Sequence, residues 1–300
     1  MKNAGYTLLY IVLKALALLP LGLLYIFADV LYLLVYHVVR YRRRVVRENI
    51  KACFPFMTEA GRADVERRFY HNFADYVVET VKLLHISGRE MARRMTFENL
   101  DIIDSLTEAG HDVIVYFSHS GNWEWGASMT MHMRRGEAEG VRYCQVYRPL
   151  SSTAFDRIML RIRSRFGSTS IAKKQTLRKL VEMNRAGLRT VTCFMSDQKP
   201  SAGDPTLVLE FLNRPTAFIT GTETLARKLG YAAVYWDISK PRRGHYHITC
   251  RLLTDDPAAC QSGDITRRYA AMLEETIKRS PSIWLWTHNR WKHPVTLPPK

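Results

Sequence analysis

The sequence predicts an α/β fold with a mostly parallel sheet flanked by helices, together with an N-terminal helical segment that anchors the chain in a membrane. Short runs of β-branched and aromatic residues alternate with stretches whose apolar residues recur at helical spacing, and the first forty residues are almost continuously apolar. Of the 300 residues, 47% are hydrophobic and 24% are charged, which provides ample material for a core and excludes a disordered protein.

The apolar segment spans residues 6–39 and is longer than the ~20 residues that a membrane-crossing helix needs. Pro20 and Gly22 are expected to kink it or to split it into two shorter helices. A long buried helix of a soluble protein is the alternative. We therefore divide the chain into an anchor, residues 1–40, and a main domain, residues 41–300. Only three ionisable side chains interrupt the segment: Lys14, Asp29 and His37.

Basic residues follow the apolar segment directly and are abundant throughout the chain. Lys and Arg outnumber Asp and Glu by 44 to 28, and the resulting net charge of +16 favours an anionic partner such as phospholipid headgroups. Because basic residues beyond an apolar span are retained on the cytoplasmic side, we expect the main domain to lie there, against the membrane. A solvated helix face is the alternative for this flank, which comprises Arg40, Arg42, Arg43, Arg44, Arg47 and Lys51.

The main domain is predicted to alternate between helices and strands, with no linker that would split it. A helix is expected over Ala63–Leu84, a buried strand over Val113–Phe117, and a last amphipathic helix around residues 265–277 that stops before Pro281. The other expected strands are Val141–Val146, Thr190–Met195, Ala232–Trp236 and His245–Leu252. The other expected helices are Thr153–Arg165, Lys174–Ala186 and Thr220–Leu229.

The segment after the strand Val113–Phe117 carries the candidate chemistry, because parallel sheets bind ligands beyond the carboxyl ends of their strands. His119 lies at the strand end, and Glu124 falls in the first turns of the next helix. With Gly121 freeing the backbone, the imidazole is expected to fold back over the helix start, where the Glu124 carboxylate orients it as a general base. A buried histidine paired with a carboxylate for structure is the alternative. Ser120 is expected to cap the helix.

The chain carries six sequence blocks, in this order: YRRRVVRENI, HSGNWEWG, Tyr147-Arg148-Pro149, Asp197-Gln198, FLNRPTAFITGTETLARKLG and EETIKRSPSIWLWTHNRWK. Taken in this order, the blocks resemble the bacterial lipid A biosynthesis acyltransferases, the late lauroyl/myristoyl transferases within the lysophospholipid acyltransferase superfamily. The block HSGNWEWG is similar to the family's H-x-x-x-x-D/E signature, and EETIKRSPSIWLWTHNRWK is similar to its C-terminal P-x-x-W-x-W-x-H-x-R-W-K. At Asn213 the family often has Gly, and the P-E-G-T-R-like block of glycerolipid enzymes is absent from the sequence.

The resemblance implies a membrane-bound O-acyltransferase at the cytoplasmic face of the inner membrane, with residues 41–300 as the acyltransferase domain. It would move a fatty acyl chain from acyl carrier protein or acyl-coenzyme A to a hydroxyl of an anionic glycolipid, a lipid A precursor. His119 would act as general base with Glu124 orienting it, and no covalent nucleophile, metal or cofactor is expected.

The resemblance also implies substrate-binding residues. Arg148 would bind a phosphate or stabilise charge on the thioester oxygen, with a surface salt bridge as the alternative. Asp197 and Gln198 would organise the histidine loop or contact a sugar, with a plain strand-end turn as the alternative for Gln198. Asn122, within the histidine block, is included among the substrate-binding residues.

The other notable residues have structural interpretations. Five scattered cysteines without a C-x-x-C pair indicate neither a zinc module nor a disulfide framework. We expect packing or interfacial anchoring from Trp284, Trp286 and Trp291, and a solvated basic face from Arg161, Arg163 and Arg165.

Two other function classes stay open. One is an acyltransferase of the same fold that acts on another glycolipid, an aminolipid or a lysophospholipid. The other is a non-enzymatic, membrane-tethered basic binding protein. Binding to nucleic acid is not expected, because the charge begins at the membrane flank and spreads along the chain instead of gathering on one module.

Overall fold

The computed structural model, which describes residues 2–297, contains a seven-stranded sheet in the order β1-β9-β8-β2-β5-β3-β4. Strands β8, β2, β5, β3 and β4 are parallel to one another. Strand β9 is antiparallel to β8, and β1 is parallel to β9. The predicted α/β fold with a mostly parallel sheet is therefore confirmed. The strands are β1 (Met95–Glu98), β2 (Val113–Phe117), β3 (Val141–Tyr147), β4 (Thr169–Ala172), β5 (Arg189–Met195), β8 (Ala232–Arg242) and β9 (His245–Thr254).

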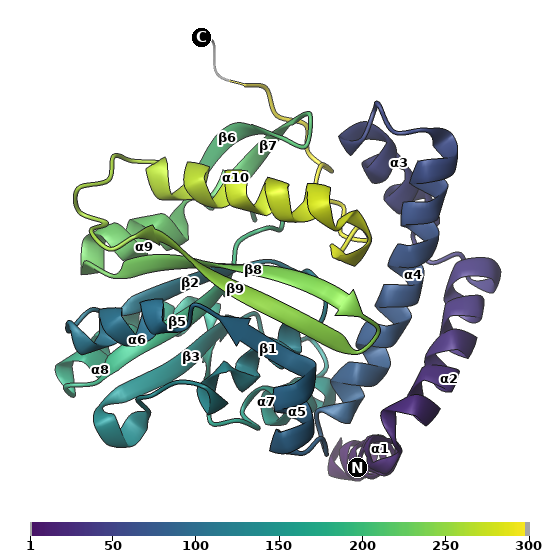
Figure 1. Cartoon of the computed structure of the whole chain (residues 1–300), viewed down its shortest axis with the longest axis horizontal. Helices are drawn as coiled ribbons and strands as arrows, with labels where there is room; N and C mark the ends of the chain where they lie inside the picture. The colour runs from purple at the N-terminus through teal and green to yellow at the C-terminus, as the bar shows by residue number, and fades with distance from the viewer. Residues whose placement is uncertain (1, 298–300) are drawn as a thin grey trace.

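Both faces of the sheet are covered, as expected for a parallel sheet. On one face, Tyr116 of β2 and Tyr235 of β8 pack against Tyr269 of α10 (Asp264–Arg279), which Figure 1 shows lying along the sheet. The next side chains along these strands, Phe117 and Trp236, point to the other face, because successive side chains of a strand alternate. That face carries the 3₁₀ helix η2 (Trp123–Met131). The other helices of this part are α5 (Gly88–Arg94), α6 (Asp101–Glu108), α7 (Thr153–Arg163), α8 (Thr176–Arg185) and α9 (Gly221–Leu229), with the short 3₁₀ turns η3 (Glu137–Glu139), η4 (Lys173–Gln175) and η5 (Pro281–Ile283).

The chain changes direction across the sheet beside β2. From β2 it passes to β3 and β4 and returns to β5, and it then crosses to β8 on the other side of β2. Loops on either side of such a reversal diverge and leave a crevice at the carboxyl ends of the strands, where open α/β sheets bind ligands. The loops after β2 and β5 meet at this place.

A second, two-stranded sheet joins β6 (Thr206–Phe211) and β7 (Arg214–Ile219), which the sequence analysis did not predict. Its turn places Leu212 and Asn213 in the left-handed region, with φ of 51° and 61°. A tight hairpin favours positive φ at both central residues, and asparagine tolerates it better than most side chains. Position 213 therefore has a backbone conformation that suits Gly or Asn.

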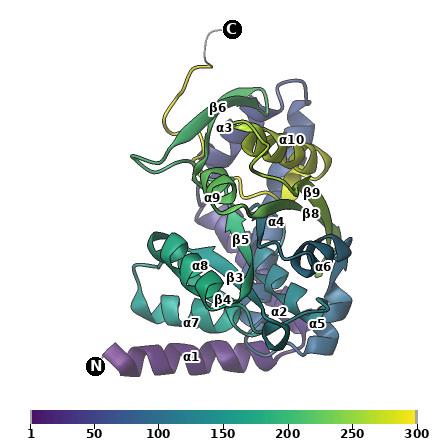
Figure 2. The same cartoon turned by 90° about the vertical axis from the view of Figure 1, so that its left-hand side faces the viewer.

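The apolar N-terminal segment is split, as predicted, beside Pro20. Helix α1 (Lys2–Leu18) ends there, and α2 (Leu21–Leu33) continues through the π-helical turn η1 (Leu34–Val38). Figure 2 shows α1 lying across one end of the molecule beside α7, whereas α2 packs along α4 (Glu59–Lys82). Helix α3 (Arg43–Cys53) follows η1 in the chain and leads into α4.

One described segment, residues 21–38, is long and apolar enough to cross a membrane. It buries only about a fifth of its residues inside the protein, 22%. The rest of its surface includes a row of exposed apolar side chains: Leu23, Ile26, Phe27, Val30, Leu33, Leu34 and Val38. The boundary at residue 40 between anchor and main domain stays a prediction.

Candidate active site

His119 and Asp197 lie side by side because their strands are neighbours. In the parallel pair β2–β5, Phe117 is opposite Met195, so the residues two positions beyond each strand end fall at the same level. The His119 Nδ1 atom lies 2.7 Å from Asp197 Oδ1, and the His119 backbone N–H donates to Oδ2 at 3.0 Å. The carboxylate therefore holds both the ring and the backbone of the histidine.

Asp197 is almost completely buried and accepts a third hydrogen bond, from Trp284 Nε1 at 2.9 Å. Burial by itself raises the pKa of this carboxyl group, but the His119 imidazole, the His119 backbone N–H and the Trp284 indole favour the charged form more strongly and lower the pKa to about 2. An ionised Asp197 can only accept a hydrogen bond here, so the Nδ1–H of a neutral imidazole donates to it. The Nε2 atom is then the unprotonated nitrogen of the ring.

The other ring nitrogen of His119, Nε2, contacts Gln198. The Gln198 side-chain amide lies 3.3 Å from Nε2 and is oriented to donate to it. The His119 side chain keeps 15% of its surface exposed, whereas that of Asp197 keeps 2%. Asp197 and Gln198 thus contact Nδ1 and Nε2 of the ring, respectively, and the imidazole stays partly accessible.

The C-terminal segment fixes the loop that carries the histidine. Leu285 N donates to His119 O at 3.0 Å, and Gly121 N donates to Ile283 O at 2.9 Å, so residues 283–285 pair with the loop like a short strand. Gly121 has φ of 57°, and a Cβ atom there would lie 3.0 Å from the Tyr246 ring. A glycine is therefore required both by the backbone conformation and by the close contact.

Glu124 does not contact His119 as the sequence analysis expected. Both of its carboxylate oxygens accept from Arg163 at the end of α7, from Nε at 2.9 Å and from Nη2 at 2.6 Å. The reason is local: η2 begins at Trp123, whose ring packs against His119 and Tyr76, and the next side chain points a third of a turn away. Arg163, expected on a solvated face, is instead partly buried in this ion pair, with 15% of its side chain exposed.

Asn122 is also placed differently from the prediction that it binds substrate. Its side chain is completely buried, its Oδ1 accepts from Trp125 N at 3.3 Å, and its Nδ2 donates to Glu79 Oε2 at 2.9 Å. Both ends of the amide are therefore occupied within the protein. Asn122 caps η2, which is the task expected of Ser120.

Arg148 lies one residue beyond β3, at the same edge of the sheet as His119, and its side chain is exposed. It makes no hydrogen bond or ion pair to another residue of the described range 2–297, so the alternative of a surface salt bridge finds no partner there. Its guanidinium is accessible to an anion in solution or at a membrane surface.

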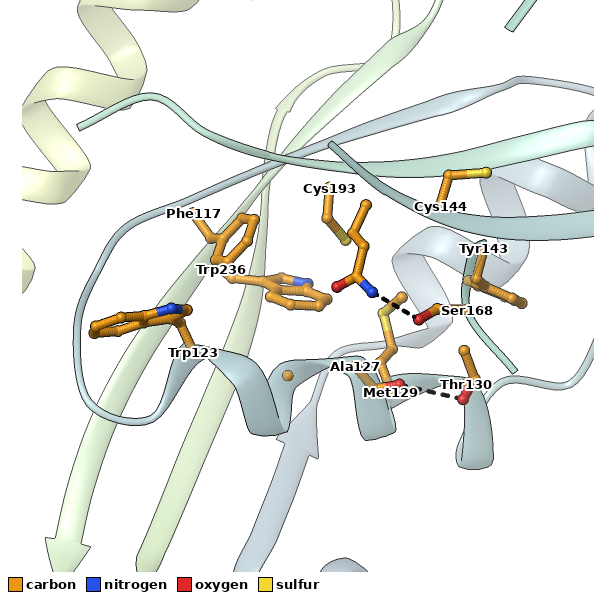
Figure 3. A pocket seen from close by; sticks show the side chains of 12 residues that line it. Phe117, Trp123, Ala127, Met129, Thr130, Tyr143, Cys144, Ser168, Cys193 and Trp236 are labelled. Carbon is orange, nitrogen blue, oxygen red and sulfur yellow. Dashed lines mark hydrogen bonds between the residues drawn. The ribbon is translucent and has the colours of Figure 1, made fainter. Parts of the chain in front are cut away.

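A narrow cavity, lined mostly by apolar side chains, lies beneath the histidine loop between η2 and the sheet. Figure 3 shows Trp123 at one end of it, Phe117 and Trp236 in the middle, and Met129 and Thr130 of η2 along one wall. An adjoining space reaches Ser118, the neighbour of His119 in the chain. Trp123 lines both spaces and packs against the His119 ring, so the imidazole is separated from the cavity by this one side chain.

No group of three or more His, Cys, Asp or Glu side chains within residues 2–297 is arranged to hold a metal ion. All five cysteines are buried and unpaired. Burial raises the pKa of Cys144 and Cys250 to about 12, so these thiols stay protonated near neutral pH.

The family model described as bacterial lipid A biosynthesis acyltransferase matches residues 1–293. The chain belongs to this family. Comparison with individual curated proteins gives no match. Family membership implies acyltransferase activity in lipid A biosynthesis. In this acyltransferase, residues of three of the sequence blocks lie together: His119, Asp197 and Trp284.

The C-terminal motif of the acyltransferase supplies contacts that the sequence analysis did not assign. Trp284 was expected to serve in packing or anchoring, yet it binds the acid that holds His119. His288 Nε2 accepts from Lys199 N at 3.1 Å, and burial lowers the pKa of this imidazole to about 4, which keeps it neutral. Arg290 is buried and donates to Ala217 O in β7. The sequence held one signal for the contact between His119 and Asp197, because both residues follow a buried strand.

Proposed function

We propose that this protein transfers a fatty acyl chain from an acyl thioester, on acyl carrier protein or coenzyme A, to a hydroxyl group of a lipid A precursor. The observation that carries the proposal is the hydrogen bond between His119 Nδ1 and Asp197, which leaves Nε2 as the basic nitrogen of the ring. Membership of the lipid A acyltransferase family supports the same reaction.

In the proposed reaction, His119 Nε2 takes the proton of the acceptor hydroxyl as its oxygen attacks the thioester carbonyl. The new C–O bond gives a tetrahedral intermediate, which collapses by breaking the C–S bond. The imidazolium then returns the proton to the leaving thiolate, so that a free thiol departs. Asp197 stabilises the imidazolium while it exists, as expected for an acid held against Nδ1.

Two further features support the substrate assignment. The apolar side chains of Trp123, Met129 and Trp236 lie together next to the histidine loop and suit contact with a fatty chain. The unpaired guanidinium of Arg148 lies at the same edge and suits a phosphate of the acceptor or the carbonyl oxygen of the thioester. We assign to Asp197 and Gln198 the organisation of the histidine and not a contact with the sugar.

We further propose that the protein attaches to the cytoplasmic face of the inner membrane through the exposed apolar side of residues 21–38. The basic flank that follows would then contact anionic headgroups. This arrangement would bring a membrane-embedded acceptor to the open side of the site and leave the carrier protein in the cytoplasm.

The experiment is acyl transfer by the full chain in nanodiscs that contain anionic phospholipid, with products identified by mass spectrometry. Acyl carrier protein and coenzyme A thioesters are offered as donors, and a lipid A precursor or a lysophospholipid as acceptor. Acylation of the lipid A precursor by the wild type, and its loss in His119→Ala, are the expected results. Activity that survives in His119→Ala contradicts the base, and acylation of lysophospholipid alone contradicts the acceptor.

A further inference from the structure

Helix α4 presents a row of buried charged side chains to the N-terminal helices. Asp75, Glu79 and Lys82 are spaced four and three residues apart, so they share one face of the helix, and all three are buried. Packing one apolar helix on another requires only apolar side chains, and burying a charge is costly unless it is paired. A task beyond simple packing is therefore indicated for this row.

The first and last members of the row hold the N-terminal helices in place. Asp75 accepts from Arg243 in the turn between β8 and β9, and Arg243 also pairs with Asp29 of α2. Lys82 Nζ donates to Ala17 O at 3.0 Å and to Leu19 O at 2.8 Å, at the end of α1. These contacts dock the anchor against α4.

Glu79, in the middle of the row, connects the anchor to the active site. It is completely buried, and its Oε1 accepts from Tyr25 Oη of α2 at 2.9 Å. Its Oε2 accepts from Asn122 Nδ2 at 2.9 Å and from Tyr246 Oη of β9 at 2.8 Å. Its backbone oxygen accepts from Trp125 Nε1 at 3.1 Å. One residue thus joins α2, the sheet and the loop that carries His119.

Asn122 depends on Glu79 for its orientation. Its Oδ1 is already used in capping η2, so its Nδ2 must find an acceptor inside the protein, and Glu79 Oε2 provides one. Asn122 lies three residues after His119, and Trp123 between Asn122 and Glu124 packs against the imidazole. A shift of Glu79 would therefore move the histidine loop.

We propose that Glu79 is a positioning residue that couples the docking of the anchor helix α2, through Tyr25, to the geometry of the histidine loop, through Asn122. The proposal rests on the proposed function. It means that the anchor helix does more than attach the protein to the membrane, because one of its hydroxyl groups, that of Tyr25, helps to position the histidine loop. Full acyl transfer requires α2 to be seated on α4, and displacement of α2 would lower the turnover number of enzyme that is still folded and membrane-bound.

The first test compares Tyr25→Phe with Tyr32→Phe, two conservative changes on α2. Both tyrosines pack against α4, and phenylalanine preserves the ring contacts, but only the Tyr25 hydroxyl group reaches Glu79. In nanodiscs, Tyr25→Phe is expected to lower kcat about five- to tenfold, with KM for the acyl thioester changed less than about twofold. Amide hydrogen exchange at residues 118–125 should rise in the same variant. Tyr32→Phe should match wild type in both measurements.

The second test separates hydrogen-bond geometry from charge at Glu79. In Glu79→Gln, the amide oxygen can accept from Asn122 and Tyr246 while the amide nitrogen donates to Tyr25 Oη, so kcat per folded enzyme should stay within about threefold of wild type. Glu79→Leu has nearly the same volume but no acceptor, and a loop displaced by it should lower kcat about 100-fold. If Glu79 served only through its negative charge, Glu79→Gln would lose as much activity as Glu79→Leu.

The outcomes distinguish the two proposals. If wild type transfers acyl chains and His119→Ala does not, the proposed function stands. Equal kcat and equal loop exchange in Tyr25→Phe and Tyr32→Phe would then overturn the coupling alone, as would a Glu79→Gln enzyme as impaired as Glu79→Leu. Absence of transfer in the wild type counts against the proposed function and not against the coupling.

Discussion

Two buried acids flank the histidine loop, and they have different partners. Glu124 is five residues from His119 in the sequence and binds the guanidinium of Arg163, whereas Asp197 is 78 residues away and binds the imidazole. Both carboxylates are almost completely buried, with 4% and 2% of their side chains exposed. Neighbourhood in the sheet therefore decides which acid orients the histidine, and neighbourhood in the sequence does not.

The difference follows from the elements that carry the two acids. Asp197 continues a strand that is hydrogen-bonded to the strand of His119, so the register of the sheet places the two side by side. Glu124 belongs to η2, which starts with a tight turn after Gly121 and directs its second residue toward α7. The ion pair of Glu124 thus attaches η2 to α7, while Trp123 of the same turn reaches the imidazole.

The sharpest way to break this comparison is Asp197→Asn. An asparagine with its amide nitrogen toward Nδ1 favours the wrong tautomer and cannot stabilise the imidazolium, so kcat should fall about 10³–10⁴-fold. Circular dichroism and thermal unfolding of the same preparation check that the variant is folded. A kcat within tenfold of wild type, measured on acyl carrier protein and coenzyme A thioesters alike, would remove Asp197 from the proposed mechanism.

Glu124→Ala should act mainly on stability. It leaves the largely buried Arg163 guanidinium without its partner, and the cost for a fully buried pair, about 3–5 kcal/mol of unfolding free energy, is the upper limit here. The matched control is the double variant Glu124→Leu/Arg163→Met, in which apolar side chains replace the whole pair. Such replacements are often neutral, so the double variant should recover most of the stability and of the transfer activity.

Denaturant unfolding and acyl transfer are measured on both Glu124 variants. If the stable double variant has no activity, Glu124 or Arg163 takes part in the chemistry, and the contrast between the two acids is smaller than the contacts indicate. If activity and stability both recover in the double variant, Glu124, the acid of the H-x-x-x-x-E motif, has a structural role in this chain.

Much of the fold was predictable because local patterns carry it. The run VIVYF predicted β2 with the bounds that the structure has, and the amphipathic spacing of Ile265, Tyr269 and Leu273 predicted α10. Strands β1 and β4 have only four residues each, too few for a periodic signal. The hairpin β6–β7 is interrupted by Leu212 and Asn213, whose turn conformation the residue types indicate only weakly.

The site was harder to predict because its contacts depend on strand order. His119 and Asp197 were both recognised at strand ends, but nothing in the sequence states that β5 lies beside β2 while β3 lies farther away. The short spacing to Glu124 therefore directed the expected contact to the wrong acid. The role of Trp284 depends on pairing between residues 283–285 and the histidine loop, which has no local signature either.

Trp284→Phe sharpens the comparison with the smallest expected effect. It preserves an aromatic ring but removes one of the three donors to Asp197, so kcat should fall about five- to tenfold. The pKa of Asp197, about 2 in the folded protein, should also rise toward the ordinary value of about 3.9. An acid whose pKa is depressed by folding contributes stability above its unfolded pKa and loses it as pH falls through the folded value. The unfolding free energy should therefore drop less steeply in Trp284→Phe than in wild type between about pH 4 and pH 2.

The control is Glu124→Gln in the same titration. Since Glu124 does not contact Trp284, this variant should leave the contribution of Asp197 to the unfolding free energy unchanged. An equal change in both variants would show that the two acids belong to one coupled network.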